Sequence, residues 1–583
     1  MKVFSTELKA MFLEAALKAF PELSESELTP LVTVEEPRDS HHGEMACAAP
    51  LRLAKKLKLG PEKCAQKIIK SFPHDYRINA LEFAAPGYLN VKFSEEFLRE
   101  GLKSLSGGFS IEGENADTRP IVIDYSSTNA AKHMGAHHIL TTIIGDSLAN
   151  LFDFFGCETV RINHLGDWGT QFGKIIYALR EWGDMKEVEK HPNDEFTRLY
   201  VKFCNEEEKK PELTEEARKI FKSMEDGHEE TLALWKWITE ESLKDLNKIF
   251  KRLGVEFDYI TGESFYLKMA EEVVKDGLKR KILKKGEGGA IIFPMKGDET
   301  PALLKKSDGA TLYLTRDVAT IKYRVETWHP AAILYVVDRA QALHFMQNFA
   351  VARALGYAPE DTALEHTAFG RMNFADSAMS TRKGNVIKLN DMLDEAATRA
   401  GSMAAGKGTE LPREELYKMA EIIGVASIKY AVLSQDRNKD IIFDWDKIIT
   451  LEGNSAPYLL YSYARAKSIM NKALGAGKSA GDPASGMMSG MPEFSEEAER
   501  AMVRKMLKFP EAMHKALIER KPHIIATALY ELCQEFNRFY GVVPVLTAGD
   551  ESAKRTRLGI LQAFMHQIKS GLNILGIPVL ERM

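Results

Sequence analysis

The sequence predicts a multidomain α/β protein with, in chain order, an α+β domain, a doubly wound parallel-sheet domain and an all-α bundle. At 583 residues the chain is too long for one hydrophobic core and should divide into about three or four domains. Short β-rich runs, each leading into a helical pattern, begin at Ile121, and after about Ala400 helical patterns continue almost alone. Alternating β and α units of this kind favour a parallel sheet with helices on both faces.

The first block, residues 1–110, mixes helical and strand patterns. The run "PLRLAKKLKLGPEKCAQKIIKSF" has apolar residues at helical spacing, and "GYLNVKF" is typical of a strand. The loop "GGFSIEGENADTRP" then separates this small α+β domain from the next block.

The central block, residues 111–400, contains five short runs that we expect to be strands: "IVIDY", "ETVRIN", "GAIIF", "TLYL" and "AAILYVV". A charged, Trp-containing helical stretch at about 185–253 is predicted to be an insertion in this sheet domain. The last block, residues 401–583, is helical apart from "GAGKSAGDPASGMMSGMPEF", whose composition predicts a flexible connector.

Composition excludes several classes of protein. The net charge of −5 provides no global basic field, so any nucleic-acid binding must come from local patches. The five cysteines form no CxxC pair, which argues against a disulfide framework and a Cys-rich zinc site. No apolar run is long enough to span a bilayer, and Glu7 and Glu14 do not suit a secretory or transit peptide. We therefore expect a cytoplasmic protein.

The stretch "KHMGAHH", residues 132–138, follows the first predicted strand of the sheet and precedes a helix expected from about His137. Ligands of doubly wound sheets bind at the carboxyl ends of strands, where helix N-termini attract anions. Lysine and histidine there suit phosphates. The histidines could instead bind a metal, although no cysteine or carboxylate lies nearby until Asp146, or could simply cover a solvated helix start.

A second basic stretch, "MSTRKGNVI" at 379–387, resembles a mobile loop that closes over a triphosphate. Together the two stretches resemble the signature motifs of class I aminoacyl-tRNA synthetases. Further motifs, in the order of that family, resemble arginyl-tRNA synthetase: "YSSTNAAK", "TTIIGDSLANLFDFFG", "RINHLGDWGTQFGK", "LYLTRDVAT", "QALHFMQ", "MSTRKGNVIKLNDMLDEA", "SAPYLLYSYARAKSIM", "EFNRFY" and "LGIPVLERM". The resemblance covers nearly the whole chain, and its first block, with "HHGEMACAAPLRLAKKL" and "PGYLN", is the weakest part.

The resemblance implies a Rossmann-like catalytic domain, an N-terminal domain that contacts the tRNA elbow and a C-terminal anticodon-binding bundle. It implies that arginine attacks the α-phosphate of ATP, that Mg-pyrophosphate leaves, and that the arginyl group passes to the 3′-terminal adenosine of tRNA(Arg). We expect ATP with Mg²⁺ as substrate, no zinc or other tightly bound cofactor, no protein-held metal, and a monomer. Two other classes remain open: a paralogue that binds tRNA or arginine without catalysis, and a ligase with a different acceptor.

A guanidinium is planar, permanently charged and rich in donors, so its pocket should contain carboxylates and other acceptors. The resemblance implies that Asp317, Glu263 and Tyr313 hold the arginine side chain. Asn129 and Gln341 match positions that hold its α-amino and carboxylate ends or orient the pocket. His164 is expected to complete the pocket, together with Asp124, which stands where the family more often has Glu.

In the second signature the first expected lysine is replaced by Ala378, so Lys132 is expected to supply the missing charge at the phosphates. Without gaps, the first signature places Gly135 at its first histidine, Ala136 at the apolar position, His137 at the glycine and His138 at its second histidine. A shifted register would use His133, Gly135 and His137 but needs compensating length changes on both sides. The other residues expected at ATP or its reacting phosphates are Arg382, Lys383, Met379, Ser380, His344, Gly166 and Asp167.

For tRNA, the resemblance implies contacts from both terminal blocks. Tyrosines can stack on unpaired bases, although Tyr at helical spacing is more commonly half-buried packing. The residues concerned are Tyr458, Tyr461, Tyr540 and Met583 in the last block and Asn90 and Phe93 on a strand of the first.

Overall fold

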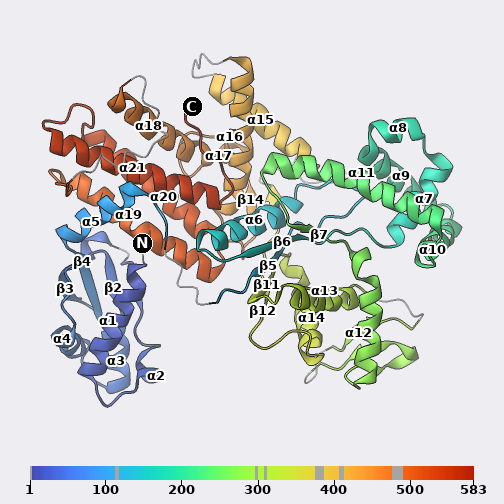
Figure 1. Ribbon diagram of the computed structural model, residues 1–583, viewed down its shortest axis with the longest axis horizontal. Coiled ribbons are helices and arrows are strands. Elements are labelled where there is room, and N and C mark those ends of the chain that lie inside the picture. Colours follow the sequence, from blue (N-terminus) through green and yellow to red (C-terminus); the bar gives the residue numbers. More distant parts are fainter. Residues whose placement is uncertain are drawn as a thin grey trace. The chain divides into compact units, whose positions relative to one another are not determined.

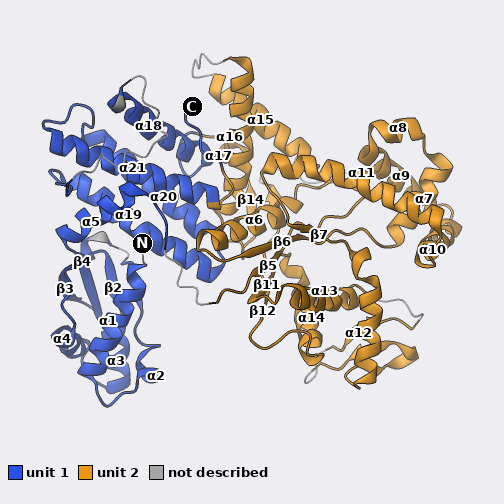
Figure 2. Cartoon of the chain, viewed as in Figure 1, with its two compact units in different colours: residues 1–113, 451–573, 578–583 blue, residues 114–450, 574–577 orange. Residues whose placement is uncertain are grey.

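The computed structural model describes residues 3–37, 39–111, 117–295, 300–307, 312–374, 387–405, 412–475 and 490–583. The chain forms two compact units (Figure 2). Unit 1 comprises Met1–Gly113, Leu451–Asn573 and Pro578–Met583, and unit 2 comprises Glu114–Thr450 and Ile574–Ile577. Both ends of the chain thus contribute to unit 1, while a short piece of the C-terminal segment belongs to unit 2.

The first part of unit 1 is the expected α+β structure (Figure 1). Its four-stranded antiparallel sheet has the order β1-β2-β4-β3. The run predicted to be helical from Pro50 forms two helices because Lys58 adopts a left-handed backbone (φ 54°) and Pro61 starts the second helix. The elements are α1 (Phe4–Ala19), α2 (Glu25–Leu28), β1 (Val34–Glu35), β2 (Met45–Cys47), α3 (Ala49–Leu57), α4 (Pro61–Ser71), β3 (Ile78–Ala84), β4 (Tyr88–Phe93) and α5 (Glu95–Gly107).

The second part of unit 1 is a helical bundle of α18 (Ala456–Leu474), α19 (Glu497–Glu519), α20 (Pro522–Val542) and most of α21 (Glu551–Ile574). Phe536 of α20 stacks on Phe564 of α21, with ring centroids 4.1 Å apart. At the start of α19 the buried Glu499 forms a capping box and accepts a hydrogen bond of 2.7 Å from Arg557 Nε. Most of the predicted connector, residues 476–489, lies outside the described residues.

Unit 2 contains a five-stranded, fully parallel sheet with the order β12-β11-β5-β6-β7. Its strands are β5 (Ile121–Asp124), β6 (Thr159–Asn163), β7 (Tyr259–Ile260), β11 (Ala332–Tyr335) and β12 (Ala363–His366). The chain runs outward from β5 in one direction through β6 and β7, and later in the other direction through β11 and β12. The strand order therefore reverses between β5 and β11, the place where doubly wound sheets bind ligands.

Helices cover this sheet through apolar contacts. Between β5 and β6, α6 (His138–Phe154) packs so closely that a Cβ on Gly145 would lie 2.3 Å from Tyr125 Cβ. A hydrophobic cluster that includes Val122, Ile333 and Phe345 joins the sheet to α13 (Tyr313–Trp328) and α14 (Ala342–Ala354). The multidomain α/β class predicted from the sequence is confirmed.

Two of the five predicted runs differ from expectation: one is a strand but lies in another sheet, and the other is not a strand. The run "GAIIF" contains β9 (Ile291–Phe293), but this strand lies in a separate antiparallel sheet with β8 (Lys284–Lys285) and β10 (Ala302–Lys305). The run "TLYL" provides the start of α13 instead of a strand. Four apolar residues do not distinguish a strand from one turn of a buried helix, and here the helical period of Leu314, Val318, Ile321 and Val325 prevails.

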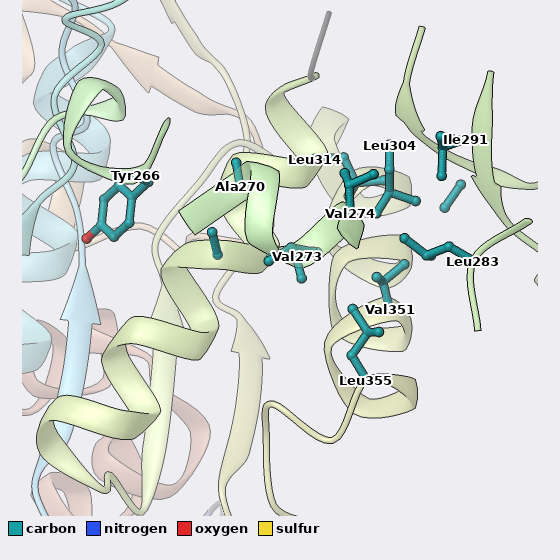
Figure 3. Close-up of a cluster of buried hydrophobic side chains, with 13 residues drawn as sticks. Tyr266, Ala270, Val273, Val274, Leu283, Ile291, Leu304, Leu314, Val351 and Leu355 are labelled. Carbon is teal, nitrogen blue, oxygen red and sulfur yellow. The ribbon is translucent and has the colours of Figure 1, made fainter. Parts of the chain in front are cut away.

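The small sheet, η2 and the three helices α12, α13 and α14 share one hydrophobic cluster (Figure 3). Tyr266, Ala270, Val273 and Val274 come from η2 (Glu263–Tyr266) and α12 (Leu267–Lys279), and Leu314 comes from α13. This cluster fixes the first turn of α13 beside η2, so side chains from the two segments can share one site.

Four consecutive helices lie in the chain between β6 and β7, after α7 (Thr170–Trp182). They are α8 (Met185–Lys190), α9 (Pro192–Glu207), α10 (Glu212–Glu225) and α11 (Glu229–Leu253). After β13 (Met372–Phe374) come α15 (Leu389–Ala405), α16 (Arg413–Leu433), β14 (Ile441–Phe443), which pairs in parallel with β13, and α17 (Trp445–Ile448).

Candidate active site

A cavity of about 580 Å³ opens in unit 2 beside the carboxyl ends of β5 and β11, at the reversal of strand order. All seven residues predicted to bind arginine line it, with two of those predicted to bind ATP. They are Asp124, Asn129, His164, Glu263, Tyr313, Asp317 and Gln341, with Gly166 and His344. The structure therefore brings together residues from five separate stretches of sequence.

Glu263 is the most perturbed acid of this cavity. Its pKa is raised to about 7, mainly by burial, while Arg316 lowers it and the nearby Asp317 and Asp167 add to the increase. Arg316 Nη2 lies 3.0 Å from Glu263 Oε2, but without the alignment of a hydrogen bond, and this oxygen is buried without a donor among the described residues. A buried carboxylate beside other carboxylates is stabilised by any cation that enters. The cavity is thus suited to a positively charged ligand.

Asp317 lies just after the first turn of α13 and faces the same cavity. Its Oδ2 lies 2.6 Å from His344 Nε2 of α14, and about a quarter of each side chain is exposed. Two acids, Glu263 and Asp317, therefore reach the cavity from two segments that a common hydrophobic cluster fixes.

Asp124 lines the cavity but already has a strong partner. Its Oδ2 lies 2.7 Å from Nη2 of the fully buried Arg324, whose guanidinium also faces the Tyr335 ring at 5.2 Å from the centroid. The negative charge of Asp124 raises the pKa of Arg324 and balances its charge. Sequence reasoning assigned Asp124 to arginine and missed this internal arginine.

The loop after β5 is joined to the loop after β6. Gly166 N donates to Thr128 O at 2.9 Å, and Ala130 N donates to Gly166 O at 3.1 Å. A Cβ on Gly166 would lie 2.2 Å from Asn129 Oδ1, so the two loops approach closely at this glycine. At Gly169 a Cβ would meet nothing nearer than 3.6 Å, and the glycine is needed for its φ of 141°.

Asp167, predicted at the ATP site, is absent from the cavity lining. Its carboxylate instead accepts hydrogen bonds from Ser264 N at 2.9 Å and Ser264 Oγ at 2.6 Å. Gly262 permits this, because a Cβ there would lie 2.2 Å from the same carboxylate. Asp167 therefore fixes the turn that carries Glu263.

The histidine stretch lies at the start of α6 and outside this cavity lining. Gly135 N donates to His138 Nδ1 at 3.0 Å, and the His137 and His138 rings lie 4.0 Å apart. Burial, with a smaller effect of His137, lowers the pKa of His138 to about 4. His138 is therefore neutral near pH 7, and because Nδ1 is an acceptor, its proton lies on Nε2.

The chain that follows the second signature pairs with this stretch. Ala136 N donates to Ile387 O and Leu389 N donates to Met134 O, both at 2.8 Å. Ala378, Met379, Ser380, Arg382 and Lys383 lie outside the described residues. Lys132 and His133 face helix α9, with Lys132 Nζ 4.7 Å from the centroid of the Tyr200 ring and His133 Nε2 2.9 Å from Asp194 Oδ1.

The sequence analysis missed Arg316, Thr320 and Arg324, which lie on α13 near Asp317. If "LYLTRDVATIKYR" had been predicted to be a helix, its period would have placed four polar side chains on one face of that helix, those of Tyr313, Asp317, Thr320 and Arg324. It also missed Tyr335, whose position at the end of β11 was a usable signal.

Three of the predicted tRNA-binding residues form a cluster in the helical bundle of unit 1. The Arg465 guanidinium lies over the Tyr461 ring at 4.7 Å and over the Tyr540 ring at 5.7 Å. Asn537 Nδ2 donates to Tyr458 Oη at 2.8 Å, and Tyr540 is 42% exposed. Met583, at the chain end, is half-buried.

The two predicted residues of the first block are buried. Asn90 is 5% exposed, and Phe93 is 7% exposed and packs edge-on against Phe4 and Phe97. Each lines a surface cavity of unit 1.

Within the described part of the chain, no group of three or more His, Cys, Asp or Glu side chains could hold a metal ion. A search of the same residues finds no helix that combines the length and the apolar character needed to cross a membrane.

Comparisons with known proteins agree along the whole chain. Three family models match: "Arginyl tRNA synthetase N terminal domain" at residues 6–93, "tRNA synthetases class I (R), catalytic domain" at 105–445 and "DALR anticodon binding domain" at 459–583. The arginine–tRNA ligase of Fusobacterium nucleatum is 39% identical over all of both chains. That of Alkaliphilus metalliredigens is 36% identical over 95% of this chain and 96% of its own.

Among solved structures, the arginyl-tRNA synthetase of Plasmodium falciparum superposes with a TM-score of 0.85 at 25% identity and covers all of both chains. The Thermus thermophilus arginyl-tRNA synthetase has the same fold, with a TM-score of 0.81 at 21% identity over 99% of this chain and all of its own. Family models, relatives and cavity agree: the chain belongs to the arginyl-tRNA synthetase family of class I aminoacyl-tRNA synthetases.

Proposed function

We propose that this protein ligates L-arginine to tRNA(Arg) with ATP, through an arginyl-adenylate. The arginine carboxylate attacks the α-phosphorus of ATP, and Mg-pyrophosphate leaves. A hydroxyl of the 3′-terminal adenosine of tRNA then attacks the arginyl carbonyl, and AMP leaves. ATP and its Mg²⁺ are substrates in this scheme, and we propose a cytoplasmic monomer.

The acidic cavity is the observation that supports arginine as the substrate. Glu263 and Asp317 reach one space of about 580 Å³, and a fixed fork of donors can pair with both. In this proposal they hold the guanidinium, and Tyr313 covers it. Asn129, Gln341 and His164, also on the cavity wall, hold the amino and carboxylate ends.

An uncharged or shorter substrate should be rejected without a separate editing site. It would donate to neither carboxylate, so Glu263 would keep only Arg316, which is not aligned for a hydrogen bond, and Asp317 would keep only His344. Buried polar groups left without a hydrogen-bond partner cost about 1–3 kcal/mol, more when charged. Lysine keeps a charge but has one point of attachment, so it cannot satisfy both carboxylates in the same way.

For the ATP half of the reaction we propose the ungapped register. His138 is neutral and carries its proton on Nε2, so it can donate to a phosphate oxygen without a change of charge. Together with Arg382 and Lys383, Lys132 supplies the positive charge that Ala378 does not. The residues assigned to the surroundings of ATP are Met379, Ser380, Gly135, Ala136, His137 and His344. Asp124 and Asp167 are assigned a positioning role, because Arg324 and Ser264 engage their carboxylates.

For tRNA we propose that Tyr540 and Tyr461, aligned by Arg465, stack on unpaired bases of the anticodon loop. Tyr458 and Met583 complete that surface. Asn90 and Phe93 are proposed to meet the tRNA elbow through the cavity walls that they line.

Aminoacylation of total tRNA with each amino acid tests the proposal. We expect charging with arginine alone, and ATP–pyrophosphate exchange only when tRNA is present. Charging with lysine would overturn the substrate assignment. Robust exchange without tRNA would contradict the tRNA requirement but not the substrate.

A further inference from the structure

Three consecutive residues of the loop after β5 are held by the helices that lie between β6 and β7. Each contact comes from a different side chain of α9 or α11. The pairs are Ala131 with Ser242, Lys132 with Tyr200 and His133 with Asp194.

The contact of Ala131 stabilises an unfavourable backbone. Ala131 has a left-handed φ of 60°, which a residue with a Cβ rarely adopts. Its N–H donates to Ser242 Oγ at 2.9 Å, and the Ser242 hydroxyl donates to Ile238 O at 2.6 Å. Ser242 is fully buried, so this acceptor is oriented by its own helix. The backbone just before Lys132 is therefore fixed by α11.

The Lys132 side chain is held by an aromatic face. Its Nζ lies 4.7 Å from the centroid of the half-buried Tyr200 ring of α9. Among the residues that the structure describes, no carboxylate lies within ion-pair distance of this ammonium. An aromatic ring attracts a cation far more weakly than a phosphate does, so it can hold the ammonium without competing with ATP.

The contact of His133 links the same helix to the end of the second signature. Asp194, in the first turn of α9, lies 2.9 Å from His133 Nε2 and 2.8 Å from Lys388 Nζ. The backbone of Lys388 in turn forms an isolated antiparallel β-bridge with that of Gly135. One helix therefore contacts a side chain of the histidine stretch and the side chain of Lys388, the residue that follows the second signature.

We propose that Tyr200 is a positioning residue, which holds the Lys132 ammonium on α9 where the phosphates of ATP reach it and stays in contact with this side chain in the ATP complex. The inference rests on the role of Lys132 given under Proposed function. A side chain that is ordered before binding loses less conformational entropy when ATP arrives. Tyr200 should therefore contribute to ATP binding and leave the arginine pocket unaffected.

The test compares Tyr200→Leu with Tyr200→Phe in aminoacylation assays with varied ATP. We expect Tyr200→Leu to raise the KM for ATP by about two- to fivefold, the scale of a partly exposed cation–π contact. The KM for arginine and kcat should stay unchanged. Tyr200→Phe keeps the ring face and should behave as wild type.

Trp182→Leu provides a matched control. The Lys202 ammonium lies 4.7 Å from the centroid of the Trp182 ring, the same distance as between Lys132 and Tyr200. Among the described residues, Trp182 contacts neither signature stretch. This variant should leave the KM for ATP unchanged. An equal increase in Trp182→Leu would show a general effect of ring loss and would overturn the inference.

The Lys132→Met background separates positioning from structural support. Because Tyr200 acts through Lys132, Tyr200→Leu should add nothing in that background, whereas a structural role would still raise the KM for ATP. Three outcomes would refute the role of Tyr200 but not that of Lys132. Tyr200→Leu could still raise the KM for ATP in the Lys132→Met background, or it could lower this KM in the wild-type background. It could also have no effect while Lys132→Met is impaired. A Lys132→Met enzyme with unchanged ATP kinetics would instead refute the assignment of Lys132.

Discussion

Replacement of Asp317 by alanine should remove most of the affinity for arginine. Asp317 reaches the cavity from α13, just after the first turn of this helix, and its side chain is 26% exposed. Truncation of one member of a buried charge pair costs about 2–5 kcal/mol. Because a quarter of the carboxylate side chain faces solvent, the lower part of that range applies, about 2–3.5 kcal/mol, or a KM for arginine raised about 30- to 350-fold.

The assay is tRNA charging at saturating ATP and tRNA with varied arginine. Asp317→Asn keeps the volume and removes the charge, so it should lose nearly as much affinity as alanine. Asp361→Asn is the matched control, because Asp361 is 70% exposed, pairs with Arg119 and lies outside the cavity lining.

A second measurement separates binding from folding. Asp317→Ala leaves His344 without its partner at 2.6 Å, so thermal unfolding of each variant should be followed in parallel. If the KM for arginine changed by less than about threefold in a folded Asp317→Ala enzyme, Asp317 would serve only to fix His344, and the assignment of the guanidinium pocket would be wrong.

Three further predictions follow from the site and the bundle. The pKa of Glu263 is raised to about 7, mainly by burial, and arginine binding needs the charged form of this residue. The KM for arginine should therefore rise as the pH falls below 7, approaching tenfold per pH unit, and Glu263→Gln should remove that dependence. A KM for arginine that does not change with pH in the wild-type enzyme would contradict this prediction. His138→Ala and Lys132→Ala should each lower the rate of arginyl-adenylate formation about 10²-fold, the effect of losing one transition-state donor. His133→Ala loses only a partly exposed pair with Asp194, so it should change this rate by less than about fivefold. A crippled His133→Ala with a normal His138→Ala would establish the shifted register. Tyr540→Ala should raise the KM for tRNA about 5- to 150-fold, the effect of losing one stacked base. Tyr540→Phe should be near wild type, and the KM for arginine should stay unchanged. Equal kinetics of the wild-type enzyme and both variants would show that Tyr540 does not bind tRNA.

The sequence by itself determined the family and the fold class, because both depend on local patterns and their order. Alternating strand and helix periods predicted the parallel sheet, and motifs such as "RINHLGDWGTQFGK" identified the family that the comparisons confirm. The same local reasoning failed at "TLYL", because four residues do not contain enough of either period.

Only the tertiary structure decided how the expected residues are used. Asp124 and Asp317 are both acids of the predicted pocket, yet Asp124 pairs with the buried Arg324 while Asp317 faces His344 and the cavity. The raised pKa of Glu263 and the placement of Lys132 on Tyr200 depend on segments far away in the chain. Charge, burial and strain at one residue are set by its neighbours in space, and local sequence patterns do not specify which distant segments those neighbours come from.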